Sequence, residues 1–237
     1  MPDDRSAVRG EQEPPVITPQ LLLRAYAAGY FPMAEHADSP DLFWVTPRQR
    51  GVLPLDALYL SKSLIKTIRS GVFEVRVDRD FDAVITACAK TRPDTWINDR
   101  IHALYSELFD LGHVHTVECY SQGRLVGGLY GLAMGGVFFG ESMFHLMPDA
   151  SKVALAHLVA RLRAGGFVLL DTQFVTPHLQ RMGAVTVERL NYMQGLQSAL
   201  EHEADFLVWP SDEPDNPRTV LDILQSPWQG HDLFNTY

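Results

Sequence analysis

Residues 114–144 read VHTVECYSQGRLVGGLYGLAMGGVFFGESMF, and their pattern indicates the centre of a sheet. Its apolar segments predict strands at 114–120, 125–132 and 137–142. The pairs Gln122-Gly123 and Gly135-Gly136 separate them, and such pairs are typical of tight hairpin turns. The sequence therefore predicts a three-stranded antiparallel meander.

A helix and a buried strand follow the meander in residues 151–174, SKVALAHLVARLRAGGFVLLDTQF. Ser151 is the expected N-cap of a helix at 152–164, which Gly165-Gly166 ends. Residues 167–170 are wholly apolar, as in a central strand covered on both faces. A short helix at 176–182 and a strand at 184–187 complete this part.

The segments before the meander predict a helix capped by Thr18 and short strands within 43–54. Further helices are predicted from Ser61, after the cap Asp80, and from Asn98 or Asp99. A strand at 73–78 lies among them. The order of elements indicates an α+β protein and resembles the acetyltransferase-like (GCN5-related) fold, a mixed sheet with two splayed strands. We expect a flexible arm at 1–17, a smaller N-terminal α/β domain at 18–92, a catalytic domain at 93–200 and an acidic extension at 201–237.

The net charge of -9 comes from the two ends, since residues 15–200 carry 17 acidic and 17 basic residues. Two basic groups could contact phosphates, or could be solvated helix faces. They are Lys62, Lys66, Arg69, Arg76 and Arg79, and Lys152, Arg161, Arg163 and Arg181. Two cysteines without paired spacing, no secretory leader and no apolar run near the roughly 20 residues of a membrane span predict a cytoplasmic protein.

Asp171, Thr172 and Gln173 end the buried strand. Strand alternation directs Asp171 and Gln173 to one face and Thr172 to the other. A carboxylate there must be hydrogen-bonded or paired, or it could cap the helix that begins near Thr176. An amide does not take up protons near neutral pH, so Gln173 can position a substrate but cannot act as a base.

Glu141 stands at the end of the third meander strand, on the face of Val137 and Phe139. In a splayed sheet this end lies beside the end of the strand that carries Asp171. Two carboxylates in one cleft suit a positively charged amine. A salt bridge from Glu141 to an arginine is the alternative.

Several motifs together resemble the leucyl/phenylalanyl-tRNA–protein transferases over residues 18–192. They are Arg24-Ala-Tyr26, Gly29-Tyr-Phe-Pro32, the segment 44–54, Thr95-Trp-Ile97, Leu125-Val-Gly-Gly128, Gly140-Glu-Ser-Met-Phe144, Ala150-Ser-Lys152 and Asp171-Thr-Gln173. The resemblance implies transfer of leucine or phenylalanine, and also methionine, from aminoacyl-tRNA to the α-amine of proteins that begin with Arg or Lys. This reaction marks proteins for degradation in the N-degron pathway. It implies a monomer that uses no metal or coenzyme, because the ester is already activated.

The resemblance also implies roles for residues. Asp171 and Gln173 would orient the attacking amine, and Glu141 would hold the ammonium of the esterified amino acid or the acceptor's basic side chain. The expected side-chain pocket comprises Leu129, Phe138, Met143 and Leu170, and Trp44 and Trp96 would flank it or stack on the terminal adenosine.

The sequence departs from the family pattern at His145-Leu146, where Ser-Arg is common, and at Thr172, where many members have Cys. The main alternative is an acyl-CoA-dependent N-acyltransferase of the same fold, but residues 147–152 lack its glycine-rich loop. His113, His115 and Glu118 could ligate a metal, although no further ligand has a convincing spacing and a structural histidine pair is favoured.

Overall fold

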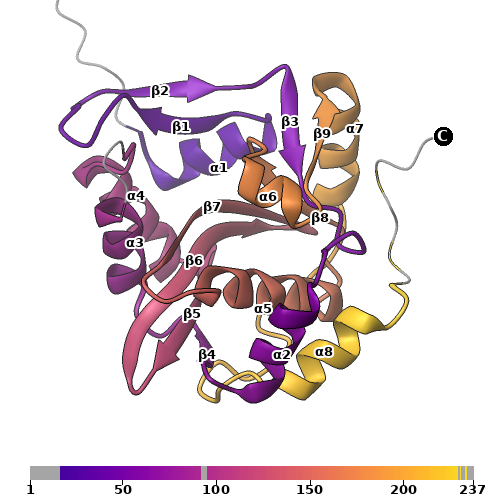
Figure 1. The fold of residues 1–237 in the computed structure, drawn as a ribbon. Coiled ribbons are helices and arrows are strands. Elements are labelled where there is room, and N and C mark those ends of the chain that lie inside the picture. Colours follow the sequence, from indigo (N-terminus) through magenta and orange to yellow (C-terminus); the bar gives the residue numbers. More distant parts are fainter. Residues whose placement is uncertain (1–16, 92–94, 229, 231–232, 234–237) are drawn as a thin grey trace, which may run out of the picture.

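The structure is a computed structural model that describes residues 17–91, 95–228, 230 and 233 (Figure 1). Its helices are α1 (Pro19–Ala27), α2 (Lys62–Ser70), α3 (Phe81–Lys90), α4 (Asp99–Asp110), α5 (Ala150–Ala164), α6 (Pro177–Arg181), α7 (Arg189–Leu200) and α8 (Pro217–Gln225). Its strands are β1 (Phe31–Ala34), β2 (Leu42–Val45), β3 (Gln49–Val52), β4 (Glu74–Val77), β5 (Val114–Ser121), β6 (Arg124–Met134), β7 (Val137–His145), β8 (Leu169–Gln173) and β9 (Val185–Glu188). The mixture confirms an α+β protein.

A seven-stranded mixed sheet in the order β4-β5-β6-β7-β8-β3-β9 forms the centre of the molecule. Its one parallel pair among the described strands is β7 with β8, and α5 is the crossover between them. β3 and β4 belong to the segment expected as the N-terminal domain, yet they lie in the same sheet as the later strands. β1 and β2 pair in a separate ribbon (Figure 1).

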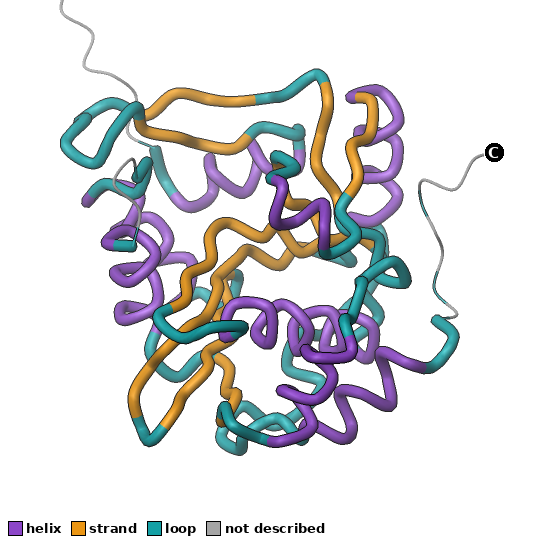
Figure 2. The backbone as a smooth tube through the Cα atoms, in the orientation of Figure 1, coloured by secondary structure: helices purple, strands orange, loops and turns teal. Residues whose placement is uncertain are grey.

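Helices cover the sheet on both faces (Figures 1 and 2). One apolar core includes side chains of α2, α5 and α8, and α5 lies against β5, β6 and β7. The other core includes side chains of α1, α3, α4 and α7. Alternate residues of the sheet enter opposite cores, because successive side chains of a strand point to opposite faces.

The predicted meander is confirmed as β5, β6 and β7, which pair antiparallel in sequence order. Gln122 and Gly123 turn between the first two strands with φ of 51° and 72°. Positive φ at both central residues matches the twist of the flanking strands. The predicted caps Thr18 and Asp80 are confirmed, since each side chain accepts a backbone N–H of the following helix. Ser61 and Asn98 cap α2 and α4 in the same way, so of the two starts left open at 98 and 99 the N-cap is Asn98.

Ser151 as the N-cap of α5 is wrong. Asp149 occupies that position with φ of 67°, and Ser151 is buried within the first turn. The helix therefore begins two residues earlier than predicted, at Ala150. The predicted elements also omitted β1, α7 and α8, and Tyr192 of α7 supplies a side chain to the site.

The acidic segment after residue 200 is anchored to α5 by a buried cluster. Arg161 and Asp215 form an ion pair there, and His157 Nδ1 lies 3.2 Å from Asp215 Oδ2. Arg161 also donates to the carbonyl oxygens of Phe206 and Trp209. Arg161 is fully buried, so it is not available to a phosphate.

The arm expected at 1–17 lies outside the described residues except for Ile17. In the described part of the chain, every helix is too short or too polar to cross a membrane.

Candidate active site

A cavity of about 520 Å³ lies where β7 and β8 diverge. The two strands pair at Val137–Phe139 against Leu169–Asp171. Apart from Leu170, the residues of these strands that line the cavity follow the paired positions. We call it the central cavity. It contains six of the predicted site residues: Trp96, Leu129, Glu141, Met143, Leu170 and Gln173.

The wall of the central cavity is largely apolar, with Leu155 and Leu158 of α5 beside the predicted Leu129, Met143 and Leu170. It can therefore enclose an apolar side chain and exclude water from its surroundings.

Two predicted pocket residues are not in the lining that the described residues form. Phe138 is fully buried beneath it, where its ring stacks on Phe206 at a centroid distance of 5.5 Å. Trp44 lies on the outer ribbon opposite Pro32, and its side chain is 38% exposed. A contact between Trp44 and a substrate stays a prediction.

A β-bulge sets the position of Glu141. Tyr130 pairs with Ser142 and Gly131 pairs with Gly140, so Glu141 is the extra residue of β7. A side chain on Gly131 would bring a Cβ within 2.3 Å of Phe139 O, which explains glycine opposite the bulge. Because the bulge shifts the alternation by one residue, both Glu141 and Ser142 line the cavity.

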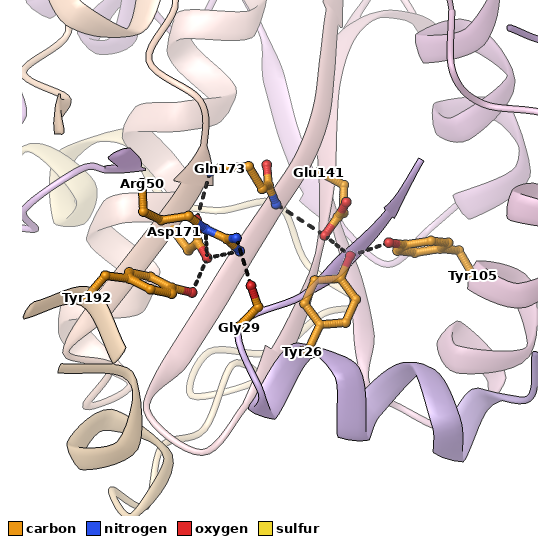
Figure 3. Close-up of polar contacts among 8 residues, drawn as sticks. All are labelled: Tyr26, Gly29, Arg50, Tyr105, Glu141, Asp171, Gln173 and Tyr192. Carbon is orange, nitrogen blue, oxygen red and sulfur yellow. Dashed lines mark hydrogen bonds and ion pairs between the residues drawn. The ribbon is translucent and has the colours of Figure 1, made fainter. Parts of the chain in front are cut away.

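The Glu141 carboxyl is held by groups from three separate segments (Figure 3). Its Oε1 accepts hydrogen bonds from Tyr26 OH at 2.5 Å and from Gln173 Nε2 at 3.4 Å. Tyr26 OH in turn contacts Tyr105 OH. Burial raises the pKa of Glu141 to about 8, and the hydrogen bond from Tyr26 opposes part of this rise. Near neutral pH the carboxyl is therefore mostly protonated.

Asp171 is buried and lies behind the cavity wall, where its carboxylate is surrounded by donors (Figure 3). Arg50 Nε and Nη2 donate to it at 2.7–3.0 Å, and Tyr192 OH donates at 2.5 Å. The backbone N–H of Gln173 donates at 2.7 Å. Arg50 Nη1 also donates to Gly29 O at 3.1 Å, so one guanidinium joins the end of α1 to β8.

The predicted placement of Asp171 and Gln173 on one face, with Thr172 on the other, is wrong. Gln173 and Thr172 both line the central cavity, whereas Asp171 is absent from the lining that the described residues form. The reason is a tight turn at the end of β8, in which Gln173 has φ of 54° and Phe174 N donates to Thr172 O. Alternation fails in such a turn. The cleft therefore contains one of the two expected carboxylates.

Close packing beside this turn requires a glycine on β3. Gly51 pairs with Gln173, and a Cβ on Gly51 would lie 2.8 Å from Thr172 Oγ1. Two hydroxyl oxygens of the cavity wall, Ser142 Oγ and Thr172 Oγ1, are buried without a hydrogen-bond partner among the described residues. Since an unsatisfied buried hydroxyl is costly, both can bind a ligand in the cavity.

The sequence interpretation assigned no role to Arg50, Tyr26, Tyr105 or Tyr192. Arg50 and Tyr26 lie within segments that resemble the family, so the motifs held a signal for them. Tyr105 and Tyr192 lie outside the quoted motifs. Their sequence pattern does not distinguish them from ordinary aromatic residues of a core.

His115 and Glu118, which were considered as metal ligands, form structural contacts instead. His115 Nδ1 lies 2.7 Å from Asp78 Oδ2, and Glu118 binds the backbone N–H groups of Arg79 and Asp80. These contacts bind the turn after β4 to β5. Within the described residues, no group of three or more His, Cys, Asp or Glu side chains could hold a metal ion.

Comparison with known proteins agrees with the resemblance. Residues 52–197 match the leucyl/phenylalanyl-tRNA protein transferase family, and residues 16–48 match the N-terminal domain of that family. A leucyl/phenylalanyl-tRNA–protein transferase of Rhodopseudomonas palustris (strain TIE-1) is 56% identical over 211 residues, which cover 88% of this chain and 94% of the relative. Those of Nitrobacter winogradskyi and Afipia carboxidovorans are 58% and 53% identical, over 84% and 88% of this chain and 89% and 93% of the relatives. The chain therefore belongs to the leucyl/phenylalanyl-tRNA–protein transferase family.

Proposed function

We propose that this protein transfers leucine or phenylalanine from aminoacyl-tRNA to the α-amine of a protein that begins with Arg or Lys. The single observation that carries the proposal is the polar pair Glu141–Gln173 on the apolar wall of the central cavity, in a chain of this family. The apolar wall suits the leucyl or phenylalanyl side chain, and the polar pair suits the reacting amine and ester.

In the proposed reaction the neutral α-amine attacks the ester carbonyl carbon. A C–N bond forms, the bond from the carbonyl carbon to the ribose oxygen breaks, and the amine loses one proton while the ribose oxygen gains one. The ester is already activated and an α-amine titrates near 7.7–8.0, so a neutral fraction exists at cellular pH. Positioning of the two substrates can supply much of the acceleration.

The ionised fraction of Glu141, which is the minor form near neutral pH, is the candidate to take up the ammonium proton. A carboxyl whose pKa lies near that of the amine can exchange the proton at small cost, and burial has raised the pKa of Glu141 to about 8. When ionised, the same carboxylate can hold an ammonium group in the cavity.

Gln173 is the candidate to orient the amine. Its Nε2 is directed to Glu141, so its amide oxygen is the atom that can accept an N–H of the amine. Asp171 is a positioning residue in this proposal, because its carboxylate holds the Gln173 backbone N–H and the Arg50 guanidinium instead of lining the cavity. This replaces a direct role for Asp171 in binding the amine.

We also propose that the sheet is of the acetyltransferase-like (GCN5-related) type. The support is the short parallel pairing of β7 with β8, the α5 crossover and the location of the central cavity beyond the paired residues. We further propose that the protein acts as a monomer in the cytoplasm and marks its acceptors for degradation.

A transfer assay tests the function. The purified protein is incubated with radiolabelled leucyl-tRNA or phenylalanyl-tRNA and with peptides that begin with Arg, Lys, Ala or Asp. Label is expected in the Arg and Lys peptides. A parallel reaction replaces the aminoacyl-tRNA with radiolabelled acetyl-CoA. The proposal would be contradicted if only acetyl-CoA labelled a peptide, or if only the Asp peptide received label from aminoacyl-tRNA.

Gln173→Ala is expected to lower kcat by roughly a hundredfold if the amide orients the amine. Gln180→Ala is the matched control, since Gln180 is exposed on α6. Circular dichroism shows whether each variant keeps its fold. Equal kcat in folded Gln173→Ala and wild type would remove Gln173 from the mechanism.

A further inference from the structure

A second cavity, of about 780 Å³, adjoins the central cavity and has a different chemical character. The two cavities share His145, Ser151 and His178 in their walls. Lys152 and Arg181 complete a set of basic side chains around the second cavity. We call it the basic cavity.

His178 lines the basic cavity together with the other basic side chains. Its Nε2 is buried and has no hydrogen-bond partner among the described residues. Burial lowers the pKa of His178, and the nearby charges of Lys152, Arg181 and His145 lower it further. All four side chains line the basic cavity, so each of them can contact an anion bound there.

Little negative charge opposes them. Asp149 is the one carboxylate among the described lining residues, and its Oδ1 lies 2.6 Å from Lys152 Nζ. No carboxylate of the described chain pairs with Arg181. Arg161 and Arg163, which the sequence grouped with these two, donate to Asp215 and to the carbonyl oxygens of Leu224 and Ser226. Of these four basic residues, Lys152 and Arg181 are therefore the two whose charged groups line the basic cavity.

The N-terminus of α5 faces the same cavity through Asp149, Ser151 and Lys152. The Asp149 side chain forms no capping hydrogen bond within the described residues. The N-terminus of a 15-residue helix carries partial positive charge and unpaired backbone N–H groups, both of which favour a phosphate.

An aromatic and an aliphatic side chain of the basic cavity indicate which chemical group is joined to the bound anion. Tyr59 and Leu146 line the basic cavity and are 63% and 64% exposed. The Tyr59 backbone N–H donates to Met182 O at 3.0 Å, which fixes the segment that carries the ring. An exposed aromatic ring beside cationic side chains is the usual arrangement for a single-stranded nucleic acid, whose bases stack while its phosphates are neutralised.

We propose that the basic cavity binds the single-stranded nucleotide that precedes the aminoacylated terminal adenosine of the tRNA. The connecting phosphate contacts Lys152 and Arg181, and the base packs on Tyr59. This inference rests on the proposed function, which provides aminoacyl-tRNA as the donor. The two cavities share wall residues, so a ligand can extend from one into the other. An aminoacyl group in the central cavity is esterified to the terminal adenosine, and the 5′-phosphate of that adenosine can therefore reach the basic cavity.

Three unreactive donor analogues test the proposal by calorimetry. They are a 3′-amide analogue of leucyl-adenosine, the same compound with a 5′-phosphate, and the same compound extended to cytidylyl-adenosine. In the wild type we expect the phosphate to tighten binding roughly tenfold and the added cytidine to tighten it by roughly a further fivefold. The gain from the phosphate should decrease as salt is raised.

Variants separate the two contacts. Arg181→Gln and Lys152→Gln should each remove most of the gain from the phosphate and leave the affinity of the unphosphorylated analogue unchanged. Tyr59→Ala should remove the gain from cytidine alone. Arg218→Gln on α8 is the matched control, because this exposed arginine lies outside both cavities and should retain both gains.

Equal affinity of the three analogues for the wild type would overturn the proposal, as would an equal loss for all three in Arg181→Gln. If Arg181→Gln raised only the KM of the acceptor peptide, the cavity would belong to the acceptor protein and the proposal would be wrong. The leucyl-tRNA transfer assay on the same preparation distinguishes failure of this inference from failure of the proposed function. Transfer without any phosphate effect would refute this inference alone, whereas absence of transfer would refute the proposed function.

Discussion

Arg50 and Asp171 form a buried bidentate ion pair between β3 and β8, although 121 residues separate them in the chain. The pair lies directly behind Gln173, whose backbone N–H the same carboxylate accepts. Burial by itself lowers the pKa of Arg50, but the Asp171 carboxylate outweighs this effect and the net direction is upward. The guanidinium is therefore charged in the folded protein.

The first prediction concerns the stability of this pair. Asp171→Asn should lower the free energy of unfolding by about 3–5 kcal/mol, because it leaves a buried guanidinium without its counter-charge. Glu74→Gln makes the same chemical change at a surface ion pair, where the glutamate is 46% exposed, and should cost no more than about 1 kcal/mol. Urea unfolding measures both, and similar costs for the two variants would contradict this account.

The second prediction concerns pH and stability. The pKa of Glu141 rises from 4.5 to about 8 on folding, so between these values the folded state holds a proton that the unfolded state has released. This linkage reduces stability as pH rises through that window. Glu141→Gln removes it, so the stability of the variant relative to wild type should rise by on the order of 3 kcal/mol between pH 5 and pH 8.

Urea unfolding of both proteins at pH 5, 6.5 and 8 checks this trend, with Glu74→Gln for comparison at an exposed carboxyl. A constant difference between Glu141→Gln and wild type across the three pH values would show that the pKa of Glu141 is not raised.

The third prediction concerns Tyr26. Burial raises the pKa of Glu141 and the Tyr26 hydrogen bond opposes that rise, so Tyr26→Phe should raise the pKa further. Tyr192→Phe removes a buried hydroxyl that donates to Asp171 instead, and should move the pKa of Glu141 less. Carbon NMR of glutamate-labelled protein follows the titration. A lower pKa in Tyr26→Phe would exclude this hydrogen bond.

The fourth prediction concerns donor choice. Met143 lines the central cavity, so Met143→Phe should narrow it and lower kcat/KM for phenylalanyl-tRNA roughly tenfold more than for leucyl-tRNA. Met134→Phe is the control, because Met134 lies on β6 outside the lining formed by the described residues. An unchanged ratio of the two donors in Met143→Phe would place the aminoacyl side chain elsewhere.

The fifth prediction concerns the acidic C-terminal segment. Asp215→Asn breaks a buried ion pair with Arg161 and should lower the free energy of unfolding by about 3–5 kcal/mol. Asp212→Asn, at an exposed position nearby, should have little effect. Below the melting temperature of each variant, KM for the donor should match wild type, since neither Asp215 nor Arg161 is among the described residues that line the central cavity. Thermal unfolding and the transfer assay measure the two quantities.

Most local elements and the family could be predicted from the amino-acid sequence alone. Hydrophobic alternation, glycine pairs and capping side chains specify β5, β6 and β7 and most helix starts, because these signals act over a few residues. The same motifs located the segments that form the central cavity, including Glu141 and Gln173.

The positions and partners of the side chains in the site could not be predicted in this way, because they depend on tertiary contacts. A bulge at Glu141 and a turn with positive φ at Gln173 broke the alternation on which the predicted faces of Asp171 and Thr172 depended. The partners of both carboxyls, Arg50 and Tyr26, come from distant segments. Backbone irregularities and long-range pairing depend on the packing of the whole chain, so no local pattern specifies them.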